Sequence, residues 1–344
     1  MKNPVSILLG LFLIVCLVDG VLDIGIGVAS RIRDRIADAA RNDDPYADMR
    51  ARKLAVMMDL PKRHVAGIGD VLQPVSVPGF TIGAGGERLH THAVAPDEAT
   101  RHILLLGASQ AFGLFNDDDE TLAAALERHM PGAVVRNFAM PGQSLPGNMM
   151  ILKQRVAAGD RIDDVLVVNG LMDLIAYCLP PTLPPPVARP VLGDMIKWVT
   201  GPAPATSGRS DVCQTPDERA IVLDRLEEDI RGLLDVAHRH DLQVTLVLTP
   251  LPYVAGAGDG TFARLAQFQR YQAIMDPLMA ALRERLDASG SDRVIDLSQS
   301  FDGTRQHGLF GDLYGHYTDA GNEALAPLIA EVLRARGMVD QAPE

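Results

Sequence analysis

Short runs of aliphatic and β-branched residues alternate with longer segments of helical periodicity over the last two-thirds of the chain. The apolar runs cover residues 102–107, 133–139, 164–170, 243–249 and 293–298. The helical patterns cover residues 119–130, 147–158, 216–240, 262–288 and 319–335. Because each apolar run is nearly continuous, both faces of its strand should be buried. Strands that are each followed by a helix predict an α/β domain, a three-layer α/β/α sandwich with a five-stranded parallel sheet.

The first 29 residues contain the one apolar stretch that could meet a bilayer. Residues 3–18 are uncharged and follow Lys2, and a second apolar stretch covers residues 21–29. Sixteen uncharged residues are short for a membrane span and generous for the core of a signal peptide. We therefore predict a signal anchor or signal peptide at 1–29, with residues 5–29 in the membrane. A buried core helix is the alternative.

The arginines that follow this segment bear on its orientation. Arg31, Arg33, Arg35 and Arg41 lie within a few residues of one another. The positive-inside tendency would keep such a group in the cytoplasm. The residues alone therefore predict a membrane-anchored or exported chain but leave the side of the main domain open.

The rest of the chain divides by composition. Residues 30–65 are charged and Ala-rich, which predicts a helical stalk, and residues 66–100 predict lead-in loops and short strands. The main domain then covers 101–340, with a Pro-rich insertion at 178–214. An insertion of this length is usually a functional loop, a lid or a flexible segment. Cys178 and Cys213 lie at its two ends, so an exported domain could form a disulfide there, while two free thiols are the alternative.

Composition excludes several classes of protein. Hydrophobic residues make up 47% and charged residues 22% of the chain, as in ordinary globular proteins. The net charge of −12 argues against a nucleic-acid partner, because such surfaces are strongly basic. Three cysteines are too few for a four-Cys zinc site, and the pairs His238/His240 and His90/His92 have no further ligand nearby in sequence. We therefore predict neither a metal nor a cofactor.

Two short motifs follow the first and second strands, whose carboxyl ends should share one edge of the sheet. Ser109 is flanked by small residues after the first strand, so a tight turn would expose its hydroxyl and its backbone N–H. An ordinary Ser N-cap is the alternative. Gly142 follows the second strand and offers a backbone N–H with no side chain in the way. A plain β–α turn is the alternative there.

Two further motifs follow the third and fifth strands. Asn169, Gly170 and Asp173 come after the third strand, where Asp173 could simply be a helix N-cap. Asp312 and His316 come after the fifth and are four residues apart, so one helical turn would place them on the same face. A carboxylate that orients an imidazole is what a general base needs.

With these four motifs the sequence resembles the SGNH (GDSL-like) hydrolases, more closely their membrane-anchored bacterial members. The resemblance covers about 101–335, and the lead-in GERLHTH also resembles that of anchored members. It implies a flavodoxin-like SGNH hydrolase fold with Ser109 as nucleophile, although Ala108 replaces the family's Asp. It also implies His316 as base, with Asp312 one residue further away than usual. Gly142 and the N–H of Ser109 would form the oxyanion hole.

The third block departs from the family pattern Gly-x-Asn-Asp. Here Gly170 and Asp173 are present, but Met172 stands where the oxyanion Asn belongs. Losing one oxyanion donor costs roughly 10²–10³ in rate. Asn169 is close in sequence, and we expect it to support the site from behind, together with Gly170 and Asp173.

The resemblance implies a serine esterase or O-acyltransferase. It would act through an acyl-Ser109 intermediate on ester groups, usually O-acetyl, of an exported or cell-surface carbohydrate, with the domain outside the cytoplasm. An inert SGNH-like module for binding or assembly in an envelope polysaccharide system is the second hypothesis, and Met172 favours it. A flavodoxin-like ligand-binding domain is the third. The acyl group, the acceptor and the oligomeric state are not specified by the sequence.

Overall fold

The computed structural model describes residues 46–66, 68–169, 171–178, 213–254, 262, 266–289, 292–301 and 308–339. Almost all of them belong to one compact unit, formed by residues 49–181 and 209–344. The predicted membrane segment at 1–29, residues 30–45 of the stalk and the interior of the Pro-rich insertion lie outside the described residues. None of the helices within the described ranges is long and apolar enough to cross a membrane. The predicted domain boundaries stay predictions.

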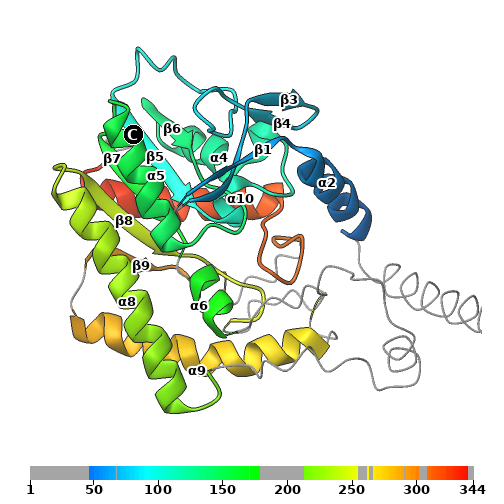
Figure 1. Ribbon diagram of the computed structural model, residues 1–344, viewed down its shortest axis with the longest axis vertical. Helices are drawn as coiled ribbons and strands as arrows, with labels where there is room; N and C mark the ends of the chain where they lie inside the picture. Colours follow the sequence, from blue (N-terminus) through cyan, green and yellow to red (C-terminus); the bar gives the residue numbers. More distant parts are fainter. Residues whose placement is uncertain are drawn as a thin grey trace, which may run out of the picture. The chain divides into compact units, whose positions relative to one another are not determined.

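A five-stranded parallel sheet forms the centre of this unit (Figure 1). Its strand order is β6-β5-β7-β8-β9. The strand of this sheet that comes first along the chain, β5, therefore lies second in the sheet, as in flavodoxin-like folds. The predicted α/β class with a five-stranded parallel sheet is therefore confirmed. The strands are β5 (Arg101–Gly107), β6 (Ala133–Asn137), β7 (Asp164–Val168), β8 (Gln243–Leu248) and β9 (Val294–Asp296).

Helices cover both faces of the sheet. α4 (Leu122–His129) packs against α10 (Asp319–Ala335) on one face, and α5 (Leu145–Ala157) packs against α8 (Pro216–His238) on the other (Figure 1). α9 (Ala266–Ser289) contacts α8, and so does the short α6 (Leu171–Cys178). Thr318 caps α10 by accepting a hydrogen bond from the N–H of Gly321, as its place before the helix predicts.

The lead-in segment forms α2 (Ala47–Asp59) and two antiparallel hairpins. The first pairs β1 (Lys62–Val65) with β2 (Gly69–Leu72), and the second pairs β3 (Val75–Val77) with β4 (Phe80–Ile82). After β4 the chain runs beside the outer edge of β6, where the N–H of Arg88 donates to the Asn137 carbonyl at 2.8 Å. The lead-in thereby covers an edge strand that would otherwise expose unpaired backbone groups.

A disulfide joins the two ends of the Pro-rich insertion. Cys178, the last residue of α6, is joined to Cys213, just before α8, by a disulfide with the Cα atoms 5.4 Å apart.

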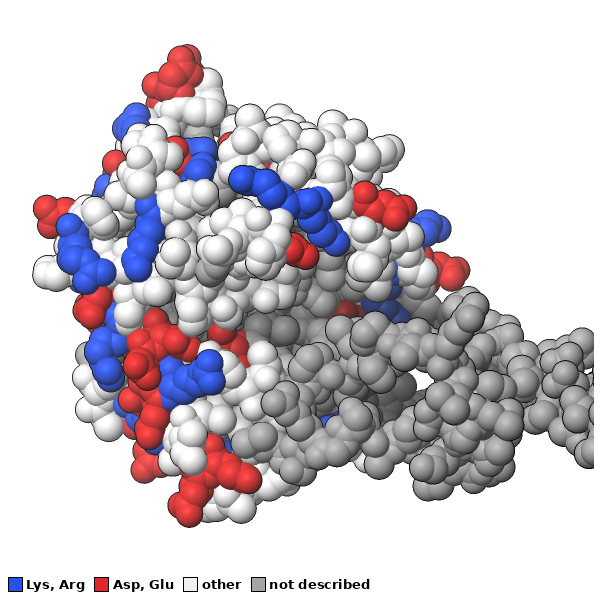
Figure 2. Space-filling view, viewed as in Figure 1, with Lys and Arg blue, Asp and Glu red and all other residues white. Residues whose placement is uncertain are grey.

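On the face viewed in Figure 2, acidic and basic side chains are intermixed over the surface. The described residues of that face therefore form no continuous basic stripe of the kind that follows a nucleic-acid backbone.

Candidate active site

Ser109 lies at a tight turn between β5 and α3 (Ser109–Phe112). Gly107 before it has φ +158°, and a Cβ there would lie 2.4 Å from the carbonyl oxygen of Val168 on the neighbouring strand, so the turn requires glycine. The N-cap of α3 is Ala108, with no side-chain capping bond. The Ser109 hydroxyl is therefore not a helix cap, and it is free to make the contact described next.

Ser109, His316 and Asp312 form a continuous hydrogen-bonded chain. His316 Nε2 lies 2.7 Å from Ser109 Oγ, and His316 Nδ1 lies 2.6 Å from Asp312 Oδ2. The three residues are 6%, 8% and 8% exposed. Because a carboxylate only accepts, Nδ1 carries the proton and Nε2 presents its lone pair to the hydroxyl. This is the tautomer that a general base for Ser109 needs.

The Asp312–His316 pair is held by a loop, and the sequence-based expectation of a helical turn there is wrong. Asp312 Oδ1 accepts the backbone N–H groups of Tyr314 at 2.9 Å and His316 at 3.1 Å. The carboxylate thus curls the chain around itself, a conformation that Asp favours over a helix. Gly315 at φ +81° completes the bend. One oxygen of Asp312 shapes the loop while the other orients the imidazole.

Side chains that the sequence analysis did not single out hold this loop against the nucleophile turn. Gln110, next to Ser109, donates from Nε2 to the Gly315 carbonyl at 2.8 Å. The ring of Phe115 stands edge-on to the His316 ring, with centroids 5.0 Å apart. Neither residue belongs to a spacing motif. Only the proximity of Gln110 and Phe115 to Ser109 in sequence could have suggested them.

The loop that carries Gly142 is bound along the end of β5. The N–H of Phe138 donates to the Leu105 carbonyl at 2.8 Å, and the N–H of Met140 donates to the Gly107 carbonyl at 3.1 Å. Gly142 itself has φ +74°. The loop therefore continues from the residue beside the nucleophile turn, and it brings Gly142 to the same rim of the sheet as Ser109.

The third-block residues position this loop from behind. Asn169 Nδ2 donates to the Gln143 carbonyl at 3.0 Å, and Asp173 Oδ1 accepts the N–H of Leu145 at 3.0 Å. Both side chains are buried. Gly170 and the side chain of Met172 lie outside the described residues. Asn169 and Asp173 thus contact the segment that follows Gly142 and do not bond to Ser109.

Arg88 is a buried residue that sequence reasoning missed. It is 1% exposed, and its guanidinium is stacked against Phe80 and Phe112, 4.2 and 4.8 Å from the ring centroids. It also contacts Asp118 Oδ1 at 3.0 Å. Such a fork of donors suits an end of a helix, where carbonyls lack intrahelical partners. Its other acceptors are the carbonyls of Gly79, Phe112, Gly113 and Asn116.

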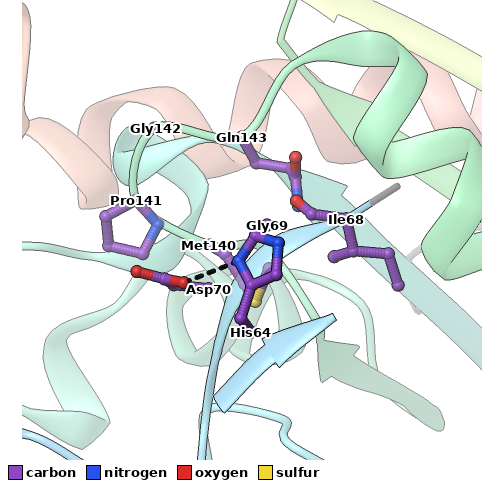
Figure 3. Close-up of a pocket in the computed structure, with 8 residues that line it drawn as sticks. All are labelled: His64, Ile68, Gly69, Asp70, Met140, Pro141, Gly142 and Gln143. Carbon is purple, nitrogen blue, oxygen red and sulfur yellow. Dashed lines mark hydrogen bonds and ion pairs between the residues drawn. The ribbon is translucent and has the colours of Figure 1, made fainter. Parts of the chain in front are cut away.

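A cavity of about 460 Å³ lies between the Gly142 loop and the β1–β2 hairpin. Figure 3 shows His64 and Asp70 of the hairpin on one side and the loop from Met140 to Gln143 on the other. His64 Nδ1 lies 3.1 Å from Asp70 Oδ1. The Gln143 amide donates to the Ile68 carbonyl at 3.3 Å and ties the two walls together. The cavity is of the size that holds small ligands.

Comparison with known proteins finds similar solved structures only. No family model matches the chain, and no curated protein matches it. A lipolytic G-D-S-L family protein of Veillonella parvula is 14% identical, with a TM-score of 0.43 over 68% of this chain and 99% of its own. The catalytic domain of a Streptococcus pneumoniae peptidoglycan O-acetyltransferase is 15% identical (TM-score 0.35; 72% and 99% covered). A variant of a Geobacillus acetyl-xylooligosaccharide esterase is 18% identical (TM-score 0.39; 71% and 98% covered). These likenesses are likenesses of fold, to a G-D-S-L family protein, an O-acetyltransferase domain and an esterase.

Proposed function

We propose that this protein is a serine-dependent ester hydrolase or O-acyltransferase that removes or transfers acyl groups of carbohydrate outside the cytoplasm. The observation that carries the proposal is the chain Ser109 Oγ–His316–Asp312, with contacts of 2.7 and 2.6 Å. A serine hydroxyl bonded to an imidazole that a carboxylate orients is the arrangement of an activated nucleophile.

The reaction begins when His316 Nε2 accepts the Ser109 proton while Oγ attacks the ester carbonyl carbon. Asp312 stabilises the imidazolium that forms. The tetrahedral intermediate collapses, and the alcohol leaves with the proton from His316. The acyl-Ser109 ester is then attacked by water or by a sugar hydroxyl, whose proton passes to His316 and then to Ser109 Oγ. The first half-reaction is the same for hydrolysis and for transfer.

The oxyanion is assigned two backbone donors, the N–H groups of Ser109 and Gly142. The hydrogen bond from Met140 N–H to the Gly107 carbonyl supports this role, since it fixes the Gly142 loop beside the nucleophile turn. Fixed dipoles that need no reorganisation are the effective form of such stabilisation. The absence of the family's Asn at Met172 leaves the site with one donor fewer.

A carbohydrate as the alcohol part of the ester is supported by the cavity in Figure 3, which Gly142 also lines. The imidazole of His64, the carboxylate of Asp70 and the amide of Gln143 offer hydrogen bonds to hydroxyls, and the Pro141 ring offers an apolar face. We expect Asp70→Ala to raise KM for acetylated oligosaccharides several-fold while kcat stays unchanged.

Export is supported by the Cys178–Cys213 disulfide, because such bonds persist in oxidising compartments. A fusion of alkaline phosphatase to the C-terminus of the full chain tests the orientation. The phosphatase is active only outside the cytoplasm, so activity supports the proposal, and an inactive, stably expressed fusion contradicts it.

The decisive test of the enzyme is fluorophosphonate labelling of the purified full-length chain, mapped by mass spectrometry. We expect labelling at Ser109, its loss in Ser109→Ala, and unchanged labelling in the matched control Ser76→Ala, an exposed serine of β3. A folded chain that does not label would favour the inert binding module, with Met172 as its cause.

A further inference from the structure

His90, His92 and Glu127 converge at a second buried site, on the α4 side of the lead-in segment. Their ligand atoms all lie within 4.8 Å of one another. His90 Nε2 and His92 Nδ1 lie 3.0 and 2.8 Å from the same oxygen, Glu127 Oε1. The side chains of His90 and Glu127 are each 1% exposed, and that of His92 is 24% exposed. None of the three takes part in the proposed reaction.

From this geometry we propose that His90, His92 and Glu127 bind a divalent transition-metal ion of the zinc type. Two imidazole nitrogens and one carboxylate oxygen form a donor set that zinc takes in proteins, with water as the fourth ligand. Metal–ligand bonds of about 2.0–2.1 Å in a tetrahedron place ligand atoms roughly 3.3 Å apart. The observed separations of 3.0 and 2.8 Å are close to that value. The partly exposed His92 leaves a side open to solvent for the water.

The hydrogen bonding of His90 points in the same direction. Its Nε2 approaches Glu127 Oε1 to 3.0 Å without hydrogen-bond geometry, and neither of its ring nitrogens has a hydrogen-bond partner among the described residues. A buried polar nitrogen left unbonded is costly. A cation between His90, His92 and Glu127 would satisfy the nitrogen that faces the carboxylate.

Glu127 is held ready as an anionic ligand. Its Oε1 accepts the N–H of Val135 at 2.7 Å, and its Oε2 accepts the N–H of Ala93 at 2.9 Å. Burial by itself would raise the pKa of Glu127, but the contacts with His90, His92 and these two N–H groups lower it to about 2. The two backbone bonds fix the orientation of the carboxylate, as outer partners of a metal ligand do.

The site would join two parts of the molecule that flank the nucleophile turn. His90 and His92 follow Arg88, whose guanidinium bonds the carbonyls at the end of α3, while Glu127 belongs to α4. We call this group, Arg88, His90, His92 and Glu127, the lead-in clip. Metal binding would join the lead-in to α4 through His90, His92 and Glu127. This role is structural and separate from the chemistry of Ser109.

The test titrates the EDTA-treated full-length chain with Zn²⁺, by calorimetry, and with Co²⁺, by its visible absorption. We expect one ion per chain, a Co²⁺ band typical of four or five ligands, and a higher Tm in the presence of Zn²⁺. His92→Ala, at the most exposed ligand, should weaken binding by about 100-fold or more and remove the Tm rise. Ser109→Ala should bind as the wild type does, which separates this site from the proposed reaction.

The matched control is the double variant His238→Ala and His240→Ala, which removes the other His-x-His pair, exposed at the end of α8. It should leave stoichiometry, affinity and the Co²⁺ spectrum unchanged. A chain that binds no metal, or that loses binding equally in the control and in His92→Ala, would overturn the proposal. The cluster would then be a hydrogen-bonded Glu–His group that only ties the lead-in to α4.

Discussion

Two sites, the group Ser109, His316 and Asp312 at the rim of the sheet (the rim) and the lead-in clip, are built from the same two chemical groups, a buried carboxylate and an imidazole. In the rim, Asp312 lies 2.6 Å from His316, and in the clip, Glu127 lies 2.8 Å from His92. The difference is the third group. His316 turns its free nitrogen to the Ser109 hydroxyl, whereas the clip presents a second imidazole, His90, to the same carboxylate oxygen. Beside a hydroxyl, the carboxylate–imidazole pair can act as a base. Beside a second imidazole nitrogen, it forms the proposed set of metal ligands.

The carboxylates also differ in what else they hold. Asp312 bonds two N–H groups of its own loop, so its position depends on the residues beside it in sequence. Glu127 bonds N–H groups of Ala93 and Val135, which belong to separate segments. The Asp312 carboxylate is therefore held within its own loop, whereas the Glu127 carboxylate is held by tertiary contacts. Changes in the rim should remove activity with little loss of stability, and changes in the clip should do the reverse.

Asp312→Asn should show the largest effect, and it falls on the rim. An amide at this position can donate to Nδ1 and so impose the wrong imidazole tautomer, which lowers kcat by about 10⁴-fold, roughly 5.5 kcal/mol in the barrier. Ester hydrolysis or the rate of fluorophosphonate labelling measures it. Urea unfolding should show a loss of no more than about 1–2 kcal/mol. If kcat fell less than tenfold, Asp312 would not orient the base.

Arg88→Gln should have the largest effect on stability, because it leaves the partly exposed Asp118 carboxylate and several carbonyls without their buried donor. We expect a loss of about 3–5 kcal/mol in the free energy of unfolding. The measurement is urea unfolding followed by circular dichroism. The matched control is Arg136→Gln, whose ion pairs with Glu87 and Asp160 are partly exposed and should contribute about 1 kcal/mol or less. Equal losses would mean that the clip is an ordinary surface contact.

This contrast explains how much could be predicted from the sequence. The sheet follows from continuous apolar runs, and Ser109, Asp312 and His316 each lie in a short motif that comes after a strand. The loop conformation of 312–316 was not predictable by spacing, since an offset of four fits a helix and a carboxylate-centred turn equally well.

The clip was missed for a different reason. His90 and His92 are 35 or more residues away from Glu127, and Glu127 looks like one more charged position in an amphipathic helix. Arg88 likewise bonds carbonyls, which have no sequence signature. Contacts of this kind depend on how the lead-in lies against β6 and α4, and periodicity carries no information about that.

Glu127→Gln tests the clip through the pH dependence of the free energy of unfolding, measured in EDTA so that no metal is bound. The pKa of Glu127 is lowered from 4.5 to about 2 in the folded chain. Its contribution is therefore complete above pH 4.5 and is lost as pH falls toward 2, a total of about 3 kcal/mol. The stability difference between wild type and Glu127→Gln should shrink by that amount over this window. A stability difference that is independent of pH would mean that the hydrogen bonds to Glu127 do not favour its ionised form.

Asp164, at the start of β7, should make stability change with pH in the opposite direction. It is buried, its Oδ2 accepts no hydrogen bond within the described part of the chain, and Arg101 is 3.8 Å away. Burial raises its pKa from 3.8 to about 6. The folded state thus binds the proton more tightly, and stability is lost as pH rises through this range. Relative to Asp164→Asn, the wild type should lose about 2 kcal/mol between pH 4.5 and pH 6. A constant difference would mean that Asp164 is solvated.

Gly142→Ala is the smallest change and the most specific to the rim. A Cβ at Gly142 would meet no atom within 4 Å, so the substitution costs only the strain of an L residue at φ +74°, about 1 kcal/mol. The backbone N–H is retained. If the hydrogen bonds of Phe138 and Met140 to β5 fix the loop, the donor stays in place and Ser109 labels within a few-fold of the wild-type rate. If labelling instead falls 100-fold with the same small loss of stability, the loop has moved, and the position of this N–H limits the rate at which Ser109 reacts.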